Sequence, residues 1–129
     1  MARVRRSGTE PELLLRRKLW SMGHRYRLRM KLPGSPDLVF VSARLAVFVD
    51  GCFWHGCPVH HTLPAANRGF WLRKVTRNQE RDRRVDEELA ALGWRVLRIW
   101  EHEVREAGAL QAAASRVAES LPVRSSAAP

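Results

Sequence analysis

Two aspartates stand at the ends of apolar runs in the middle of the chain. Asp37 opens the run D-L-V-F-V, and Asp50 follows the run L-A-V-F-V after a short turn. We expect the runs to form antiparallel neighbouring strands, which would bring both carboxylates to one edge of a sheet. Adjacent carboxylates repel each other, and a hard cation with oxygen ligands, such as Mg²⁺, relieves that repulsion. The pair predicts a magnesium site suited to phosphate hydrolysis; two exposed strand-end acids are the alternative.

Two more side chains are candidates for the same chemistry. Glu12, near the start of a predicted helix, is a candidate third acid, although the helix dipole also favours an acid in a first turn. His55 lies between two cysteines in the run C-F-W-H-G-C. A neutral imidazole there could accept a proton from a water as a general base. The alternatives for His55 are no role, or service as a metal ligand.

Cysteines and histidines with metal-ligand spacing follow directly. Cys52, Cys57 and His60 have the pattern C-x4-C-x2-H in a loop without apolar periodicity, and His102 follows the last predicted strand. Structural zinc sites use four such ligands, so we predict a zinc ion held by these residues. His61 is the rival to His60, and two free thiols are the alternative to the metal.

Aromatic side chains lie among polar residues within this loop and just after it. Phe53 and Trp54 stand between the presumed metal ligands, and Phe70 and Trp71 open the next predicted helix. Aromatics beside basic residues can insert between bases and unstack DNA. Ordinary core packing is an equal alternative for Phe53 and Trp54, and the favoured one for Phe70 and Trp71 taken alone.

The charge distribution indicates a polyanionic partner. The chain carries 23 Lys and Arg against 13 Asp and Glu, a net charge of +10. Residues 1–31 hold ten basic and two acidic residues, and residues 68–84 hold seven and two, whereas residues 85–129 hold five and seven. Two separate basic blocks favour nucleic acid over a merely solvated surface.

The elements that must position these residues alternate between helical and strand patterns. Thr9 and Asn67 are predicted N-caps, and Gly23 and Gly93 predicted stops. We predict helices at 10–22, 67–92 and 101–120, an edge strand at 24–31, and strands at 37–41, 45–49 and 95–100. This order predicts an α/β fold in which a mixed sheet, with 45–49 at its centre, lies between helices.

The length fits one domain, which we place at residues 1–120, with a flexible basic arm at 1–7 and a disordered tail at 121–129. Charges interrupt every stretch long enough to cross a bilayer, and the N-terminus lacks a signal-peptide pattern. We therefore expect a cytoplasmic, nucleoid-associated protein that acts as a monomer. Mismatch-repair proteins are conceivable partners.

Several runs resemble one known family. The runs G-T-E-P-E-L-L-L-R-R, P-G-S-P-D-L-V-F, V-F-V-D-G-C-F-W-H-G-C-P, F-W-L-R-K, R-N-Q-E-R-D-R-R and L-G-W-R-V-L-R-I-W-E are similar to very short patch repair (Vsr) endonucleases. The likeness covers residues 2–104. It implies a restriction-endonuclease-like fold and Mg²⁺-dependent nicking of DNA 5′ to the thymine of a T:G mismatch, which arises when 5-methylcytosine deaminates.

The resemblance assigns roles in the active site. Asp37 matches the catalytic aspartate that binds Mg²⁺, and Val49 matches a position whose backbone carbonyl helps to hold the ion. His55 matches the general base, and Glu12 a helix acid that organises the site. The family's best-studied pattern has Thr-His where this chain has Val49–Asp50, so Asp50 would restore a second carboxylate near the ion.

It also assigns the zinc site and the DNA contacts. The zinc ligand positions and the aromatics that wedge into DNA fall on residues already singled out by spacing and type. They are Cys52, Cys57, His60 and His102 for zinc, and Phe53, Trp54 and Trp71 for the wedge. In the second basic block we predict DNA contacts from Arg73, Lys74, Arg77 and Asn78.

Three hypotheses follow. The first is a mismatch-specific, Mg²⁺-dependent nicking endonuclease. The second is a restriction-like nuclease of the same fold that acts on a different mismatch or a modified base. The third is a non-catalytic zinc DNA-binding module, which the acidic strand ends argue against because carboxylates repel phosphate unless a cation intervenes.

Overall fold

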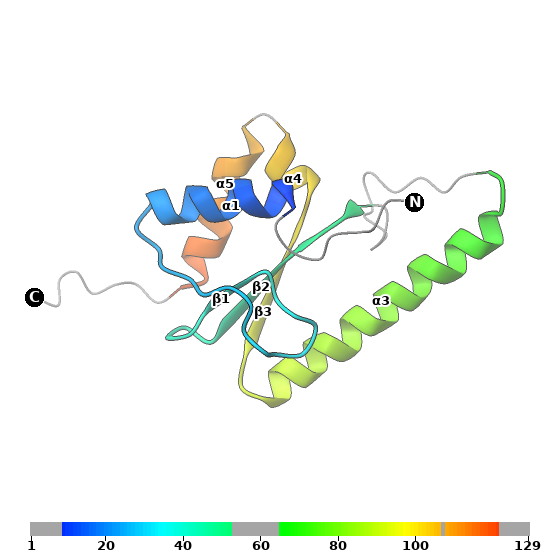
Figure 1. The fold of residues 1–129 in the computed structure, drawn as a ribbon, viewed down its shortest axis with the longest axis horizontal. Coiled ribbons are helices and arrows are strands. Elements are labelled where there is room, and N and C mark those ends of the chain that lie inside the picture. Colours follow the sequence, from blue (N-terminus) through cyan, green and yellow to red (C-terminus); the bar gives the residue numbers. More distant parts are fainter. Residues whose placement is uncertain (1–8, 53–64, 107, 122–129) are drawn as a thin grey trace, which may run out of the picture.

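The computed structural model describes residues 9–52, 65–106 and 108–121. Figure 1 shows the helices and strands of this part of the chain: α1 (Glu10–Ser21), β1 (Leu38–Phe40), β2 (Leu45–Asp50), α3 (Arg68–Ala91), β3 (Arg95–Trp100), α4 (His102–Arg105) and α5 (Ala109–Glu119). The helices predicted at 10–22 and 67–92, and the strands predicted at 37–41, 45–49 and 95–100, are confirmed to within two residues. None of the described helices is both long enough and apolar enough to cross a membrane.

The strands form a mixed sheet in the order β1-β2-β3. β1 pairs antiparallel with β2, with Leu38 opposite Val47, and β2 pairs parallel with β3, with Asp50 opposite Trp100. The predicted central position of β2 is confirmed. Consequently the start of β1 and the ends of β2 and β3 all lie at one edge of the sheet.

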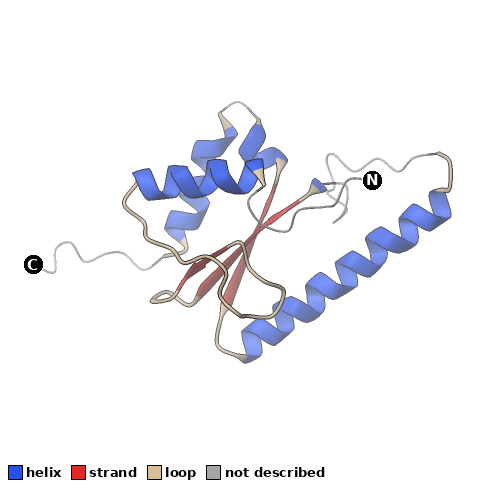
Figure 2. Ribbon diagram, viewed as in Figure 1, coloured by secondary structure: helices blue, strands red, loops and turns tan. Residues whose placement is uncertain are grey.

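Helices cover both faces of the sheet (Figure 2). On one face, Leu38, Val47 and Ile99 pack with buried residues of α1, α4 and α5. On the other face, Val39 and Phe48 alternate with them and pack with residues of α3 and the segment that follows it. This period-two alternation is what a strand between two layers requires. The α/β class is confirmed, and the arrangement fits a restriction-endonuclease-like fold.

Only part of α3 packs against the sheet. Val75 and Leu89 are its buried residues, and Val85 and Leu89 contact the smaller core cluster. Figure 1 shows the end of α3 nearest Ala91 beside the sheet, and the end nearest Arg68 extending away from it. The basic first half of α3 is therefore presented beside the edge where β2 and β3 end.

The structure corrects two of the predicted elements. The helix predicted at 101–120 is divided into α4 and α5, because Glu106 has an extended backbone (ψ 146°) and Gly108 a left-handed one (φ 78°). The strand predicted at 24–31 is reduced to one antiparallel bridge between Arg27 and Val39. Arg29, with φ of 60°, interrupts the extended conformation that a strand needs.

The caps and chain ends differ from expectation in smaller ways. Thr9 and Asn67 occupy the N-cap positions, but neither side chain makes a capping hydrogen bond, and Asn67 is left-handed. Leu121, predicted as tail, packs against the larger core cluster. The predicted arm at 1–7 and the remainder of the predicted tail lie outside the described residues.

Candidate active site

A cleft of about 710 Å³ opens at the sheet edge where β2 and β3 end. Asp37 and Asp50 both line it, which confirms that the two predicted acids share one end of the sheet. Pro11, at the start of α1, contributes to one wall, and Asn78 and Arg81 of α3 contribute to another. The cleft therefore places two carboxylates beside a basic helix face.

Asp37 is held in place by the neighbouring strand. Its Oδ2 accepts a hydrogen bond of 2.7 Å from the backbone N–H of Val49, and its own N–H donates to Val47. Burial raises the pKa of Asp37 to about 7; the Val49 donor opposes the rise, and the acids Glu12 and Asp50 add to it. Burial is therefore the main reason why this carboxyl group is costly to ionise, and the two neighbouring acids increase that cost.

Glu12 is the third acid of this group. It is 2% exposed, at the start of α1, and its Oε2 accepts a hydrogen bond of 3.0 Å from Nη1 of Arg16 one turn later. The side chain also interacts with Asp37, whose pKa it raises by charge and by hydrogen bonding. The sequence left open whether Glu12 was a first-turn acid or an active-site acid; its position places it beside Asp37.

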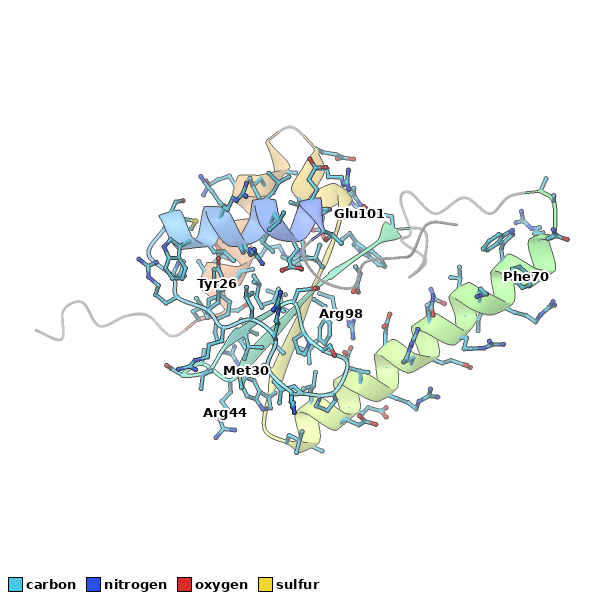
Figure 3. The ribbon with its side chains drawn as sticks, viewed as in Figure 1. Tyr26, Met30, Arg44, Phe70, Arg98 and Glu101 are labelled. Carbon is cyan, nitrogen blue, oxygen red and sulfur yellow. The ribbon has the colours of Figure 1, made fainter. Side chains whose placement is uncertain are left out.

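Asp50 is bound by an arginine that the sequence analysis missed. Nη1 of Arg98 donates to both carboxylate oxygens of Asp50, at 3.2 and 3.0 Å. The two residues lie on the same face of the adjacent strands β2 and β3, and Figure 3 shows Arg98 on the side of the sheet toward α3. One signal in the sequence could have revealed it, namely an arginine inside the apolar strand R-V-L-R-I-W, which needs an acidic partner when buried.

Cys52 and His102, two of the four predicted zinc ligands, lie side by side. Cys52 Sγ is 3.3 Å from His102 Nδ1, and the N–H of Cys52 donates to Glu101 Oε1 at 3.0 Å. Both residues follow the paired ends of parallel strands by two positions. Among the described residues no group of three or more His, Cys, Asp or Glu side chains is arranged to hold a metal ion.

Several predicted site residues fall in the segment between β2 and α3 that the structure does not describe. They are Phe53, Trp54, His55, Cys57 and His60. The roles predicted for the general base, for two of the aromatic wedges and for half of the zinc site therefore stay predictions.

The basic face of α3 borders the cleft. Lys74, Asn78 and Arg81 line it, and Nη2 of Arg81 donates to Oδ1 of Asn78 at 2.8 Å. A second hollow of about 300 Å³ lies along α3 itself and adds Arg77 and Arg84 to this set. Lys74, Arg77 and Asn78 were predicted as DNA contacts; Arg81 and Arg84 were not singled out.

The start of α3 carries an aromatic pair. Phe70 and Trp71 meet edge to face with ring centroids 5.1 Å apart, and Lys74 Nζ lies 5.7 Å from the Phe70 ring centroid. Phe70 is 46% exposed, and Figure 3 shows it at the end of α3 farthest from the sheet. Core packing was the favoured prediction for Phe70, and this prediction is wrong because Phe70 lies at the surface. Arg73, on the same turns, is also exposed.

Comparison with known proteins identifies the family. The family described as DNA mismatch endonuclease Vsr matches residues 1–62. The chain is 48% identical over 123 residues to the type II nicking enzyme V.NaeI of Lentzea aerocolonigenes, covering 91% of this chain and 71% of that protein. The chain belongs to the Vsr endonuclease family.

Two further relatives illustrate the breadth of this family. The type II nicking enzyme V.XorIIP of Xanthomonas oryzae is 47% identical over 115 residues, which is 87% of this chain and 84% of that protein. The DNA mismatch endonuclease Vsr of Escherichia coli is 47% identical over 78 residues, 57% of this chain and 48% of that protein. The resemblance inferred from the motifs is confirmed, and the cleft with its acids and basic helix belongs to a Vsr-family endonuclease.

Proposed function

We propose that this Vsr-family endonuclease nicks one strand of duplex DNA 5′ to the thymine of a T:G mismatch, in a Mg²⁺-dependent reaction. The observation that carries the proposal is Asp37: a buried carboxyl group with a pKa near 7, fixed by a strand, in a cleft bordered by a basic helix. The family membership and the names of the relatives support the nicking reaction.

The acids suit a hard cation. Asp37 and Asp50 offer carboxylate oxygens, and Val49 offers the backbone carbonyl that the resemblance assigns to the ion. The pKa of Asp37 is raised mainly by burial and further by the charges of Glu12 and Asp50, and a cation bound to Asp37 would favour its ionised form. Magnesium, when bound, supplies positive charge that stabilises the phosphate as it is attacked.

The remaining steps of the reaction are proposed for three acidic and basic side chains of the chain itself. Asp37 is oriented by the hydrogen bond from the Val49 N–H, which fixes the direction of its carboxyl group in the cleft. Glu12 holds negative charge next to it and favours cation binding. We propose His55 as the base that accepts a proton from the attacking water, whose oxygen forms a bond to phosphorus as one P–O ester bond breaks. The nick leaves the opposite strand intact.

The basic face of α3 is proposed to grip the DNA backbone. Lys74, Asn78 and Arg81 border the same cleft as Asp37, so a phosphate held by them lies within reach of the acids. Arg73 and Arg77 add positive charge on adjacent turns, and Phe53, Trp54 and Trp71 are proposed to wedge into the duplex beside the mismatch. A single copy of the chain suffices for this arrangement.

We propose structural zinc as the second metal. Cys52 and His102 provide an adjacent sulfur and nitrogen, the donors that zinc prefers, and Cys57 and His60 complete the proposed set. Such a site would join the segment that follows β2 to the end of β3. The Glu101–Cys52 hydrogen bond already joins these two elements beside the cleft.

Another target within the same reaction class is the second candidate. Most of the relatives are named type II nicking enzymes, which favours cleavage within a defined sequence context. A different mismatch or a modified base would use the same acids. The non-catalytic zinc module is disfavoured, because Glu12 and Asp50 are buried charged residues that simple DNA binding does not need.

A nicking assay tests the proposal. The purified protein is incubated with Mg²⁺ and a panel of labelled duplexes that contain each mismatch, matched pairs and 5-methylcytosine in varied contexts. We expect a single-strand nick 5′ to the thymine of T:G, dependent on Mg²⁺. Equal cutting of matched and mismatched duplexes contradicts the mismatch preference, and strong cutting of another substrate favours the second candidate. Tight binding without cleavage favours the zinc module.

A further inference from the structure

Arg98 stands between three acidic residues from two other elements. Its Nη1 donates to Asp50 of β2 at 3.0 Å, and its Nη2 donates to Asp86 Oδ1 of α3 at 2.7 Å. Nε also donates to Asp86, at 3.1 Å, and Nη1 lies 3.7 Å from Asp82 Oδ1. The guanidinium is stacked over the Phe48 ring, with Cζ 4.3 Å from its centroid. Arg98 thus joins β2, β3 and α3 at the cleft.

The two acids of α3 that meet Arg98 lie on the same side of the helix as residues that line the cleft. Lys74, Asn78, Asp82 and Asp86 are spaced four residues apart, so they form one ridge along the helix. Lys74 and Asn78 line the cleft, and the next two positions of the ridge meet Arg98. Arg98 of β3 therefore links the sheet to the ridge of α3 that faces the proposed DNA site.

The geometry favours an internal role for Arg98 over a direct DNA contact. All three guanidinium nitrogens have acidic partners within the protein. Burial alone would lower the pKa of Arg98, but the hydrogen bonds with Asp86 and the charges of Asp50 and Asp82 raise it overall. Moving this side chain to a phosphate would leave Asp50, which is 6% exposed, as a buried charge without its arginine.

We propose that Arg98 is a positioning residue, which holds Asp50 beside the catalytic Asp37 and sets the register of the α3 ridge over the cleft. This inference rests on the proposed nicking function. If it holds, loss of Arg98 displaces the acidic end of β2 relative to DNA that is already bound. The loss then affects the chemical step more than binding.

The test measures nicking kinetics of Arg98→Met, Arg98→Lys, Asp86→Asn and the Arg98→Met/Asp86→Asn double variant. Asp86 has a side chain 40% exposed, so Asp86→Asn is the milder variant and remains informative if Arg98→Met folds poorly. Arg95→Met is the matched control: it removes an exposed arginine at the opposite end of the same strand, where Nη2 donates to the Ala43 carbonyl.

We expect Arg98→Met to lower kcat by about 10- to 100-fold with KM changed less than about threefold. Asp86→Asn should lower kcat in the same direction, the double variant should be no worse than Arg98→Met, and Arg98→Lys should recover part of the loss. Arg95→Met should nick as the unchanged protein does. A raised KM with unchanged kcat and a weaker salt dependence would make Arg98 a phosphate contact and overturn the inference.

A second readout needs no activity. Thermal unfolding is compared for Asp50→Asn, Asp86→Asn and both together, with Arg98 intact and with Arg98→Met. Coupling between the two aspartates that disappears with Arg98→Met supports the inference, and additive shifts in both backgrounds overturn it. If the unchanged protein nicks no substrate, the proposed function fails, while this cycle still decides whether Arg98 couples Asp50 to α3. Lower stability with normal kcat in every variant overturns the positioning role alone.

Discussion

In the part of the chain that the structure describes, the sheet face covered by α1, α4 and α5 buries eleven hydrophobic residues in one cluster, whereas the α3 face buries five in its own cluster. On the α3 face the apolar rows end in charge: Phe48 is followed by Asp50 on the same face, with Arg98 beside it. The first layer supplies most of the hydrophobic stabilisation and carries one buried acid, Glu12, whereas the α3 layer holds the buried Asp50 with its partner Arg98, charges whose desolvation costs stability. The difference indicates that the α3 face is arranged for function at some expense of folding free energy.

The largest expected effect separates these two roles at Asp37. We expect Asp37→Asn to reduce nicking by about 10³-fold or more, because the amide cannot bind a cation as a carboxylate does. The same change should leave the free energy of unfolding at pH 8 equal or higher, because it removes a charge whose pKa is raised to about 7. Nicking kinetics and chemical denaturation measure the two effects. Loss of both activity and stability would contradict the comparison.

A core substitution should show the reverse pattern. Leu15 of α1 is fully buried in the larger cluster, and Leu15→Ala should lower the free energy of unfolding by about 2–4 kcal/mol. Nicking per folded molecule should change little. Leu72→Ala is the surface control: Leu72, on α3, is 50% exposed, and its loss should change stability by less than about 0.5 kcal/mol. Urea denaturation gives both values, and equal losses would contradict the contribution of Leu15 to the larger cluster.

The proposed zinc site predicts that metal removal lowers the stability of the protein, although the site lies beside the cleft and outside both hydrophobic clusters. Elemental analysis should find one zinc per chain, and a strong chelator should lower Tm by about 10 °C. Cys52→Ser should give the same loss without chelator and little further loss with it. A protein that is metal-free as purified, and whose melting is indifferent to chelator, would contradict the site.

How much of this arrangement the sequence predicts depends on how local the signal is. β2 and β3 were predicted because their apolar runs are continuous, and the nearness of Asp37 and Asp50 followed from a short turn between two strands. His102 was chosen as a partner of Cys52 by its residue type and by its place after the last predicted strand, and the parallel register of β2 with β3 explains why the two residues meet.

Features that depend on tertiary contacts were missed. Arg98 lies 48 positions from Asp50 and 12 positions from Asp86 in the sequence, and no local pattern connects β3 to either acid. The break at Gly108 was hidden because apolar residues on both sides of it keep a helical period. The arginine at position 29 gives no local sign of its left-handed backbone. Charged contacts and backbone reversals are set by the assembled fold.

The pKa of Asp37 makes stability depend on pH in a direction opposite to that of an ordinary surface acid. Its pKa is about 7 when folded and near 3.8 when unfolded, so the folded state retains a proton that the unfolded state has released. This contribution is fully present below pH 4 and is lost as pH rises through 7, by about 2–4 kcal/mol in the metal-free protein.

Subtraction isolates that effect from other groups. The stability difference between the unchanged protein and Asp37→Asn is measured from pH 5 to pH 8, without metal and with Mg²⁺. We expect the difference to move in favour of Asp37→Asn as pH rises, and Mg²⁺ to reverse that trend because the ion binds the ionised carboxylate. A difference that is constant with pH would show that Asp37 is ionised throughout.

The smallest expected effect tests which side of α3 meets DNA. Arg81 lines the cleft, and Arg83, two residues later and therefore about 200° around the helix, is exposed on the other side. Arg81→Gln should weaken binding to duplex DNA by about 5- to 10-fold and reduce the slope of log affinity against log salt by about one. Arg83→Gln should change affinity less than about twofold.

The two variants carry the same change in net charge, so long-range attraction to DNA is lowered equally in both. Any difference between them must come from the position of the guanidinium on the helix. Binding titrations at several salt concentrations, without Mg²⁺ so that no strand is cut, measure that difference directly. Equal losses of affinity in the two variants would mean that α3 attracts DNA only through its total charge. That result would contradict the proposal that DNA binds against the α3 side of the cleft.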